Sequence, residues 1–263
     1  MKHPLIVRLS FLVVFTLVCA CTAQATPRTY VFVHGAWMGA WCWSDVATQL
    51  RANGDEVIVV ELPAHGADTG SIADATLDAY VARVATAITS APRPVVLVGH
   101  SMGGIVITQV AEQMPTRIER LVYVGAFLPR DGETLFGLSM LDADSHLGTS
   151  IVVDQEHGIA HIPDASLDDV FIADGAADAK ATLHAHYRDE PLLPFVTPVH
   201  TTPAGWGSVD ISYVYTAQDH AVSYAAQQRM TQGLTLVSSA VLPTSHSPFL
   251  TQPMLLASTL TNL

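Results

Sequence analysis

Basic residues are scarce in this chain of 263 residues, which contains 12 lysines and arginines against 24 acidic residues. The net charge of −12 and the lack of any basic cluster argue against nucleic-acid binding, because phosphate contacts depend on grouped lysine and arginine side chains. The same shortage argues against adsorption to an anionic membrane surface. Internal repeats and low-complexity segments are missing too, so the 49% hydrophobic content belongs to one large domain or two small ones.

Long apolar runs are missing as well. The run at residues 9–20, which follows Lys2 and Arg8, falls short of the roughly 20 apolar residues that a membrane-spanning helix needs. Basic residues before this run and small residues after it predict a signal peptide over residues 1–25, and therefore export to the periplasm or the medium. Processing before Cys21, as in a bacterial lipoprotein, is the alternative and would leave a lipid anchor on that residue.

Strand and helix patterns alternate from residue 29 onward. Runs rich in β-branched and aromatic residues end in glycine or polar turn residues, and segments with apolar residues at helical spacing lie between them. Several strand runs are apolar almost throughout, as expected when helices cover both faces of a parallel sheet. The sequence therefore predicts an open, mostly parallel α/β sheet of about six strands. The predicted strands lie within residues 29–35, 55–66, 94–101, 118–129, 211–219 and 234–243.

The alternation stops at residues 131–207. This segment has scattered acids, several prolines and six of the twelve histidines, without a clear rhythm of strands and helices. A structureless loop of this length is uncommon in a compact domain. We expect a lid or cap of mostly short helices, inserted between strands four and five, over the carboxyl edge of a core formed by residues 26–130 and 208–263.

The strongest chemical signal is GHSMG at residues 99–103, which matches the pattern G-x-S-x-G. It lies between a predicted strand and a predicted helix, where the turn is so tight that the residues flanking Ser101 must be small. This geometry exposes the Ser101 hydroxyl above the sheet, and the N-terminus of the following helix directs N–H groups toward developing negative charge. Ser101 is therefore the candidate nucleophile.

A serine hydroxyl needs a base, and the base needs a third group that orients it. In sheets that carry this turn, the acid and then the histidine follow the serine in chain order, each just after a later strand. Asp219 follows the fifth predicted strand and His246 follows the sixth, so these two residues are the candidate acid and base. Asp131, soon after the fourth strand, is a second position from which the acid could come.

Two backbone N–H groups usually stabilise the oxyanion in such chemistry. We expect one from Met102, directly after the nucleophile. We expect the other from Ala36 in the loop after the first strand, where Gly35 allows a close approach of the backbone.

Four separated motifs, FVHGAWMGAWCW, LVGHSMGG, YTAQDHAV and SHSPFLTQP, resemble the α/β-hydrolase superfamily. Within it they are most similar to a serine esterase branch that holds plant methyl esterases, hydroxynitrile lyases and related bacterial esterases. The resemblance runs from about residue 30 to the C-terminus and implies the α/β-hydrolase fold. At the matching positions it implies Ser101, Asp219 and His246 as a catalytic triad, with Ala36 and Met102 as oxyanion donors.

The branch contains esterases and also lyases that release cyanide from cyanohydrins. Its lyases carry a lysine beside the catalytic histidine and a threonine at the position of Gly35, whereas this chain has Ser247 after His246. Lys180, the one lysine beyond the predicted signal peptide, is far from His246 in sequence, so cyanide would leave without a nearby cation. The sequence favours ester hydrolysis through an acyl-enzyme. A cyanohydrin lyase and a small-molecule receptor with a retained triad are the alternatives.

No metal or organic cofactor is expected, because acyl transfer by a serine triad needs none. The pairs His157 with His161 and His184 with His186 have spacings that could meet a metal ion, but neither pair has a clear third ligand nearby in sequence. After removal of the signal peptide, Cys42 has no partner for an internal disulfide.

The expected substrate is a small or medium-sized apolar ester. Trp37, Leu135 and Phe136 are the candidate substrate-binding residues, since they supply apolar surface near the oxyanion loop and at the start of the cap. Trp206 is a further aromatic candidate. Other apolar residues extend the wall at the start of the cap: Leu138, Met140 and Leu141.

Overall fold

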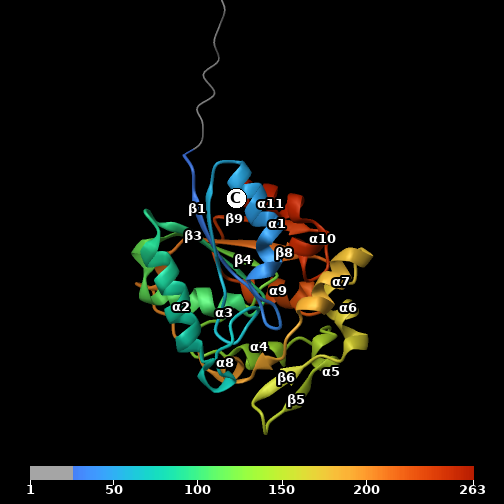
Figure 1. Ribbon diagram of the computed structural model, residues 1–263. Helices are drawn as coiled ribbons and strands as arrows, with labels where there is room; N and C mark the ends of the chain where they lie inside the picture. The colour runs from blue at the N-terminus through green and yellow to red at the C-terminus, as the bar shows by residue number, and fades with distance from the viewer. Residues whose placement is uncertain (1–25) are drawn as a thin grey trace, which may run out of the picture.

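The computed structural model describes residues 26–263, and the predicted signal peptide and Cys21 lie outside this range. A central sheet runs through the molecule with helices packed along it, and most of residues 131–207, called the cap below, lies at one end (Figure 1). None of the helices within residues 26–263 is long and apolar enough to cross a membrane.

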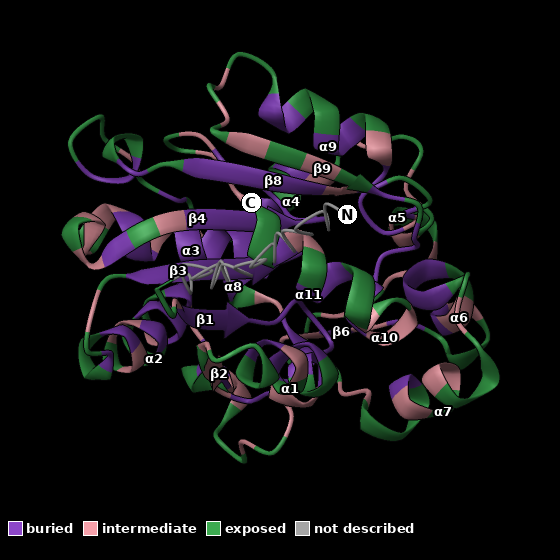
Figure 2. Cartoon of the chain, turned by 90° about the horizontal axis from the view of Figure 1, so that it is seen from above, coloured by how far each residue is buried: buried purple, intermediate pink, exposed green. Residues whose placement is uncertain are grey.

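The central sheet consists of β1 (Thr29–Val33), β2 (Glu56–Val60), β3 (Val95–His100), β4 (Ile118–Val124), β8 (Ile211–Thr216) and β9 (Ser238–Leu242). Its strands are all parallel and follow the order β2-β1-β3-β4-β8-β9. The inner strands β1 and β3 are buried at every residue, whereas the edge strands β2 and β9 are partly exposed (Figure 2). The predicted open, mostly parallel α/β fold with six strands is confirmed.

The helices of the core are α1 (Ser44–Ala52), α2 (Leu77–Ser90), α3 (Gly103–Gln113), α9 (Tyr224–Thr231), α10 (Pro248–Thr251) and α11 (Pro253–Asn262). Helix α1 packs against α11, and α2 packs against α3. Local sequence sets their ends. Gly54, just after α1, has a φ of 96°, a left-handed conformation that suits glycine after a helix. Before α2, the Thr76 hydroxyl accepts the Ala79 N–H at 3.0 Å.

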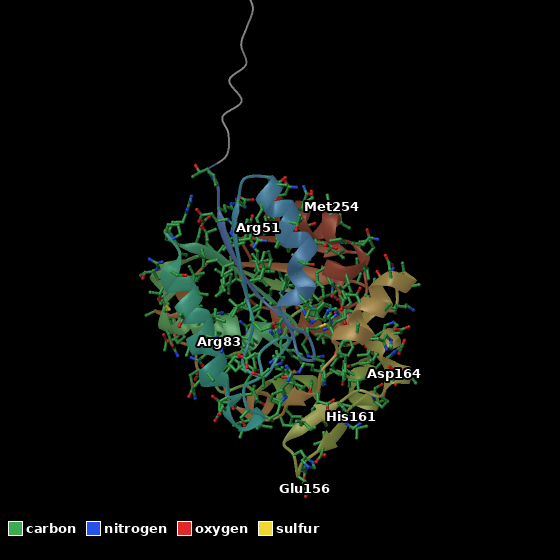
Figure 3. The ribbon with its side chains drawn as sticks, in the orientation of Figure 1. Arg51, Arg83, Glu156, His161, Asp164 and Met254 are labelled. Carbon is green, nitrogen blue, oxygen red and sulfur yellow. The ribbon has the colours of Figure 1, made fainter. Side chains whose placement is uncertain are left out.

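The cap combines short helices with a small antiparallel sheet. The sequence predicted the helices but missed the sheet, because its strands are only two or three residues long and give no periodic signal. Glu156, in the turn of this sheet, lies at the opposite end of the molecule from Met254 of α11 (Figure 3). The cap elements are α4 (Leu135–Ser139), α5 (Leu147–Ser150), β5 (Val152–Asp154), β6 (Ile159–His161), α6 (Asp164–Ile172), α7 (Ala177–His186), β7 (Glu190–Pro191) and α8 (Leu193–Val196).

The strand order brings the candidate site residues to one edge of the sheet. Strands β1 and β3 are neighbours, yet the chain continues from β1 to β2 on one side and from β3 to β4 on the other. In open α/β sheets, ligands bind beyond the carboxyl ends of the strands at such a switch point. Ala36 follows β1, Ser101 follows β3, and Asp219 and His246 follow β8 and β9, so all four lie at this edge.

Candidate active site

Ser101 occupies a sharp turn between β3 and α3. Its φ of 52° lies in the left-handed region, where a residue other than glycine is strained. Small neighbours allow this turn: a Cβ on Gly99 would lie 2.7 Å from the Gly103 carbonyl oxygen, and a Cβ on Gly103 would lie 2.8 Å from the Val33 carbonyl oxygen. Ser101 is 8% exposed and lines a cavity. The turn therefore directs the Ser101 hydroxyl into this cavity.

Replacing Gly103 by alanine is expected to destabilise the fold by roughly 1–3 kcal/mol, the usual cost of overpacking. The added Cβ would meet the Val33 and His34 carbonyl oxygens at 2.8 Å, and backbone atoms at a buried strand end cannot easily move aside. The urea midpoint of unfolding measures the change. Gly148→Ala is the matched control, because its added Cβ has no neighbour within 4 Å. Equal midpoints for the two variants would contradict the crowding at Gly103.

Asp219 and His246 form a buried pair. His246 Nδ1 lies 2.8 Å from Asp219 Oδ2, and that oxygen also accepts the Thr216 hydroxyl at 2.7 Å. The other carboxylate oxygen, Oδ1, accepts the backbone N–H groups of Ala221 and Val222, both at 2.8 Å. Because a carboxylate faces Nδ1, the imidazole carries its proton on that atom and leaves Nε2 free to accept another proton.

His246 also packs against the residue that precedes Ser101. His100 Nε2–H donates to the His246 carbonyl oxygen at 2.8 Å, and the two ring centres lie 4.4 Å apart. Complete burial, together with the neighbouring His246, holds the pKa of His100 well below its usual value, so that ring stays neutral. The Ser101 hydroxyl makes no hydrogen bond to a protein group within residues 26–263. Without substrate, catalytic hydrogen bonds are often long, and they tighten in the substrate complex.

The N–H groups of Ala36 and Met102 are placed for oxyanion binding. Both residues are buried, and both line the same cavity as Ser101. Neither N–H donates to a protein acceptor in the described part of the chain, although buried N–H groups are nearly always paired. A Cβ on Gly35 would lie 2.8 Å from Ser101 Cβ, so the Ala36 loop approaches the serine closely. Two unpaired N–H groups beside a serine can bind an oxyanion.

The alternative acid lies elsewhere. Asp131 is 66% exposed, and its carboxylate lies 3.4 Å from the ring of His200 at the surface of the cap. His220, adjacent to Asp219 in sequence, contacts Asp169 of α6, with 3.0 Å between its Nδ1 and a carboxylate oxygen. Asp219 is the acid that reaches His246.

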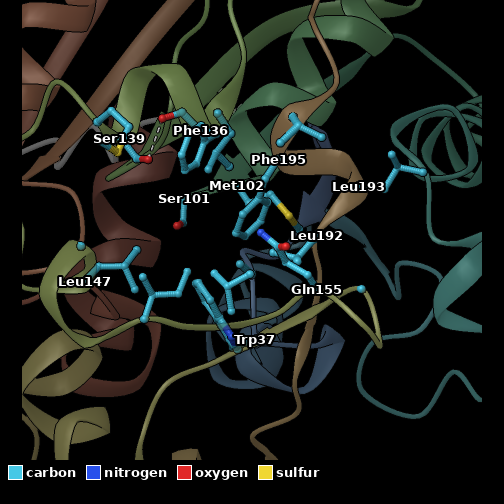
Figure 4. A pocket seen from close by; sticks show the side chains of 18 of the residues that line it. Trp37, Ser101, Met102, Phe136, Ser139, Leu147, Gln155, Leu192, Leu193 and Phe195 are labelled. Atoms are coloured by element: carbon cyan, nitrogen blue, oxygen red, sulfur yellow. Dashed lines mark hydrogen bonds between the residues drawn. The ribbon is translucent and has the colours of Figure 1, made fainter.

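A cavity of about 830 Å³ opens beside Ser101, between the core and the cap (Figure 4). The predicted residues Trp37, Leu135 and Phe136 all line it. The Ser101 hydroxyl points into the open space between Trp37 and Phe136. The cap contributes further apolar lining that the sequence did not indicate, because it comes from elements without a periodic signal: Leu147, Ile151, Val153, Leu192, Phe195 and Val196.

Three of the residues expected to supply apolar surface to the cavity do not line it. Trp206 does not line the cavity, because it is buried against β4, where its indole N–H donates to the Tyr123 hydroxyl at 3.0 Å. Leu138 and Leu141 lie instead at a smaller hollow beside Arg130 and Met230. The short helix α4 thus presents one face to the cavity and another to the core.

One histidine of each pair considered as metal ligands contacts nearby acids of the cap. His157 Nδ1 lies 2.7 Å from Asp154, and His184 lies between Asp164 and Asp168. Within residues 26–263, one group of three potential ligands forms across the cap boundary, namely His146, Asp169 and His220. Both histidines of this group lie at hydrogen-bond distance from the Asp169 carboxylate, 2.7 and 3.0 Å, so ordinary hydrogen bonds account for it.

A second buried acid–histidine pair, which the sequence did not reveal, lies beside the loop that carries Ala36. Glu190 of β7 is fully buried, and its Oε2 lies 2.8 Å from His65 Nε2. The same oxygen accepts the Trp37 N–H at 2.7 Å. One glutamate in an acid-rich segment carries no signal of burial, so only the folded arrangement identifies this pair.

The model of the Alpha/beta hydrolase family matches residues 30–259. Methylesterase 8 of Arabidopsis thaliana is 37% identical over 122 residues, which cover 44% of this chain and 45% of that protein. A carbendazim hydrolyzing esterase of Nocardioides sp. is 40% identical over 117 residues, which cover 41% of this chain and 46% of that protein. The chain thus matches less than half the length of these two curated relatives. The crystal structure of polyneuridine aldehyde esterase has a TM-score of 0.80 at 19% identity, covering 90% of this chain and 99% of that one.

Proposed function

Because the chain belongs to the Alpha/beta hydrolase family, as its four motifs indicated, we propose that it is a serine-dependent hydrolase of carboxylic esters. One observation carries the proposal. The strained Ser101 and the unpaired N–H groups of Ala36 and Met102 lie beside one apolar cavity, and the buried Asp219–His246 pair packs against His100, the residue before Ser101. The relatives named methylesterase and carbendazim hydrolyzing esterase support esters as the substrate class.

The reaction proceeds by acyl transfer to Ser101 and then to water. His246 Nε2 takes the hydroxyl proton as the Ser101 oxygen attacks the ester carbonyl carbon, while Asp219 holds the Nδ1 proton and stabilises the imidazolium. His246 then gives its proton to the leaving alcohol, and the acyl-enzyme remains. Water attacks this acyl group with His246 again as the base, which releases the carboxylic acid and restores the Ser101 hydroxyl.

The N–H groups of Ala36 and Met102 bind the negative oxygen of both tetrahedral intermediates. Neither group has to leave a protein acceptor first, so their dipoles are already in place when charge develops. Preorganised donors of this kind are typically worth about 10²–10³ in kcat each. The N-terminus of α3 adds its partial positive charge on the Met102 side.

The cavity supports an uncharged, apolar ester of medium to large size as substrate. Its volume of about 830 Å³ falls in the upper part of the roughly 300–1,000 Å³ range of ligand pockets. Glu156 and His157 are its only ionisable lining residues within the described chain. Exposed lining residues such as Phe136, Met140 and Leu193 continue the apolar surface toward the solvent. A bulky apolar group can therefore extend out of the cavity.

The lyase alternative has less support. Lys180 forms an ion pair with Asp168 at 3.3 Å and does not line the cavity. Neither lysine nor arginine occurs among the cavity-lining residues of the described chain, so a departing cyanide would meet no cationic side chain there. A receptor with a retained triad would bind its ligand with slow or no turnover, and multiple turnover distinguishes it from an esterase.

The test uses purified protein comprising residues 26–263. It is incubated with p-nitrophenyl butyrate and with p-nitrophenyl octanoate, and separately with a fluorophosphonate that labels activated serines. Sustained release of p-nitrophenol over many turnovers and a covalent adduct on the Ser101 peptide in the mass spectrum are expected. Folded protein that releases no p-nitrophenol and forms no adduct would contradict the proposal, and cyanide release from mandelonitrile would favour the lyase instead.

A further inference from the structure

The cap holds the loop that carries the Ala36 N–H. The next residue, Trp37, donates its backbone N–H to Oε2 of Glu190 at 2.7 Å, and its indole N–H donates to the Ala160 carbonyl oxygen at 3.0 Å. Glu190 belongs to β7 and Ala160 to β6, neighbouring strands of the small cap sheet. Backbone and side chain of Trp37 are thus both fixed from the cap, across more than 120 residues of sequence.

The backbone of Trp37 needs this support. Its φ of 59° lies in the left-handed region, which is unfavourable for a large side chain and persists only where the surroundings enforce it. The N–H that Glu190 accepts belongs to the peptide group that joins Ala36 to Trp37. The orientation of this peptide group therefore decides where the adjoining Ala36 lies relative to Ser101.

The Glu190 carboxyl group faces a buried histidine, His65. His65 Nδ1 lies 2.9 Å from the Pro63 carbonyl oxygen, which can only accept, so Nδ1 carries a proton. His65 Nε2 faces Glu190 Oε2 at 2.8 Å. Burial alone would lower the pKa of His65, but the Glu190 carboxylate outweighs burial and the pKa is raised. An ionised carboxylate forms a stronger, charge-assisted hydrogen bond with the Trp37 N–H than a neutral group would.

His34, Tyr80 and Glu61 are further ionisable groups close to His65. His34, at the end of β1, lies 4.9 Å from the His65 ring, but burial lowers its pKa to about 3, so it is neutral. It donates from Nδ1 to the Gly35 carbonyl oxygen at 2.8 Å, on the other side of Ala36. Tyr80 of α2 packs edge-on against His65, and Glu61, after β2, adds negative charge nearby. Among these four groups, His65 is the one placed to carry a positive charge beside Glu190.

We propose that Glu190 and His65 are positioning residues through which the cap holds the oxyanion loop in its binding conformation. The inference rests on the proposed esterase function, because the loop matters through the oxyanion that Ala36 binds. Neither residue lines the cavity, so neither touches substrate. The pair acts through the Trp37 N–H, and its loss lowers the rate of acyl transfer more than it weakens substrate binding.

The kinetic test compares Glu190→Gln with Asp189→Asn. Both changes convert an acid to its amide at adjacent positions, but Asp189 is exposed, and it is Glu190 that bonds to His65 and Trp37. We expect Glu190→Gln to lower kcat for p-nitrophenyl octanoate at least tenfold, with KM changed less than threefold, and Asp189→Asn to match the wild type. The inference would be overturned if both variants had equal kcat, or if Glu190→Gln raised KM and left kcat unchanged. If Glu190→Gln does not fold, Glu190→Gln combined with His65→Gln removes both buried ionisable groups and carries the same expectation.

A second measurement does not depend on turnover. In ¹H–¹⁵N spectra of the full described chain, the Ala36 and Trp37 amide resonances are expected to shift in Glu190→Gln and to stay in place in Asp189→Asn. Unchanged resonances in Glu190→Gln would overturn the claim that Glu190 holds the loop. A wild type without esterase activity would instead contradict the proposed function, so the two failures are distinguishable.

Discussion

Replacing Ser101 by alanine is expected to lower kcat for p-nitrophenyl octanoate by about 10⁶-fold. The methyl group cannot attack the carbonyl carbon, so no acyl-enzyme forms, while the cavity and the N–H groups of Ala36 and Met102 remain. The residual rate should therefore still exceed that of the uncatalysed reaction by roughly 10³–10⁴. Initial rates at saturating ester, with unfolding midpoints to verify the fold, measure the loss.

The proposed triad also predicts how substitutions of His246 and Ser101 combine. When catalytic residues act as a unit, removing one of them abolishes the contribution of all. His246→Ala should therefore lower kcat about as much as Ser101→Ala. The double variant should have a kcat no lower than that of either single variant. His220→Ala is the matched control, because His220 follows Asp219 directly but contacts Asp169 instead of His246. Multiplicative losses in the double variant would mean that Ser101 and His246 act independently, which would contradict the proposed mechanism.

The sequence predicted the sheet and the positions at its carboxyl edge because both depend on local signals. Buried parallel strands are apolar almost throughout, and the G-x-S-x-G turn needs small residues at fixed offsets from Ser101. Asp219 and His246 were identified because chain order in this architecture ties each to the end of a strand. The structure places these two residues 2.8 Å apart, side chain to side chain.

The cap could not be predicted to the same depth, because its contacts are long-range and its elements are short. Strand β7 has two residues, yet it delivers Glu190 to the loop after β1. A glutamate that ends fully buried looks like any surface acid in the sequence, because its partner His65 lies 125 residues away. The apolar residues of α5 and α8 that line the cavity could not be identified from the sequence either, because these helices have only four residues each.

Acids of the cap accept hydrogen bonds from three of the four loops that carry the candidate site residues. Glu190 contacts the oxyanion loop at Trp37, and Asp174 contacts Ser245, the residue before His246. Asp142 accepts the Ser223 N–H at 2.8 Å in the loop after Asp219. The excess of acids in residues 131–207, which the sequence shows only as composition, therefore serves in part to join the cap to the core.

Asp219→Asn is expected to lower kcat by about 10⁴-fold while the fold remains intact. The two backbone N–H groups of Ala221 and Val222 point at the Oδ1 position, so the asparagine carbonyl oxygen must take that place. Its NH₂ group then faces His246 Nδ1 and donates to it, which forces the imidazole proton onto Nε2. In that tautomer His246 cannot accept the Ser101 proton, although every side chain keeps its position.

Asp131→Asn is the matched control for this change, because Asp131 is the alternative acid by sequence and the structure places it at the surface beside His200. We expect its kcat to stay within about twofold of the wild type, since an exposed pair contributes little. The pattern of the two losses decides which acid orients the base. A large loss in Asp131→Asn with full activity in Asp219→Asn would assign the acid to the loop after β4. The ¹⁵N shifts of the His246 ring provide an independent measure, because the proton should move from Nδ1 to Nε2 in Asp219→Asn alone.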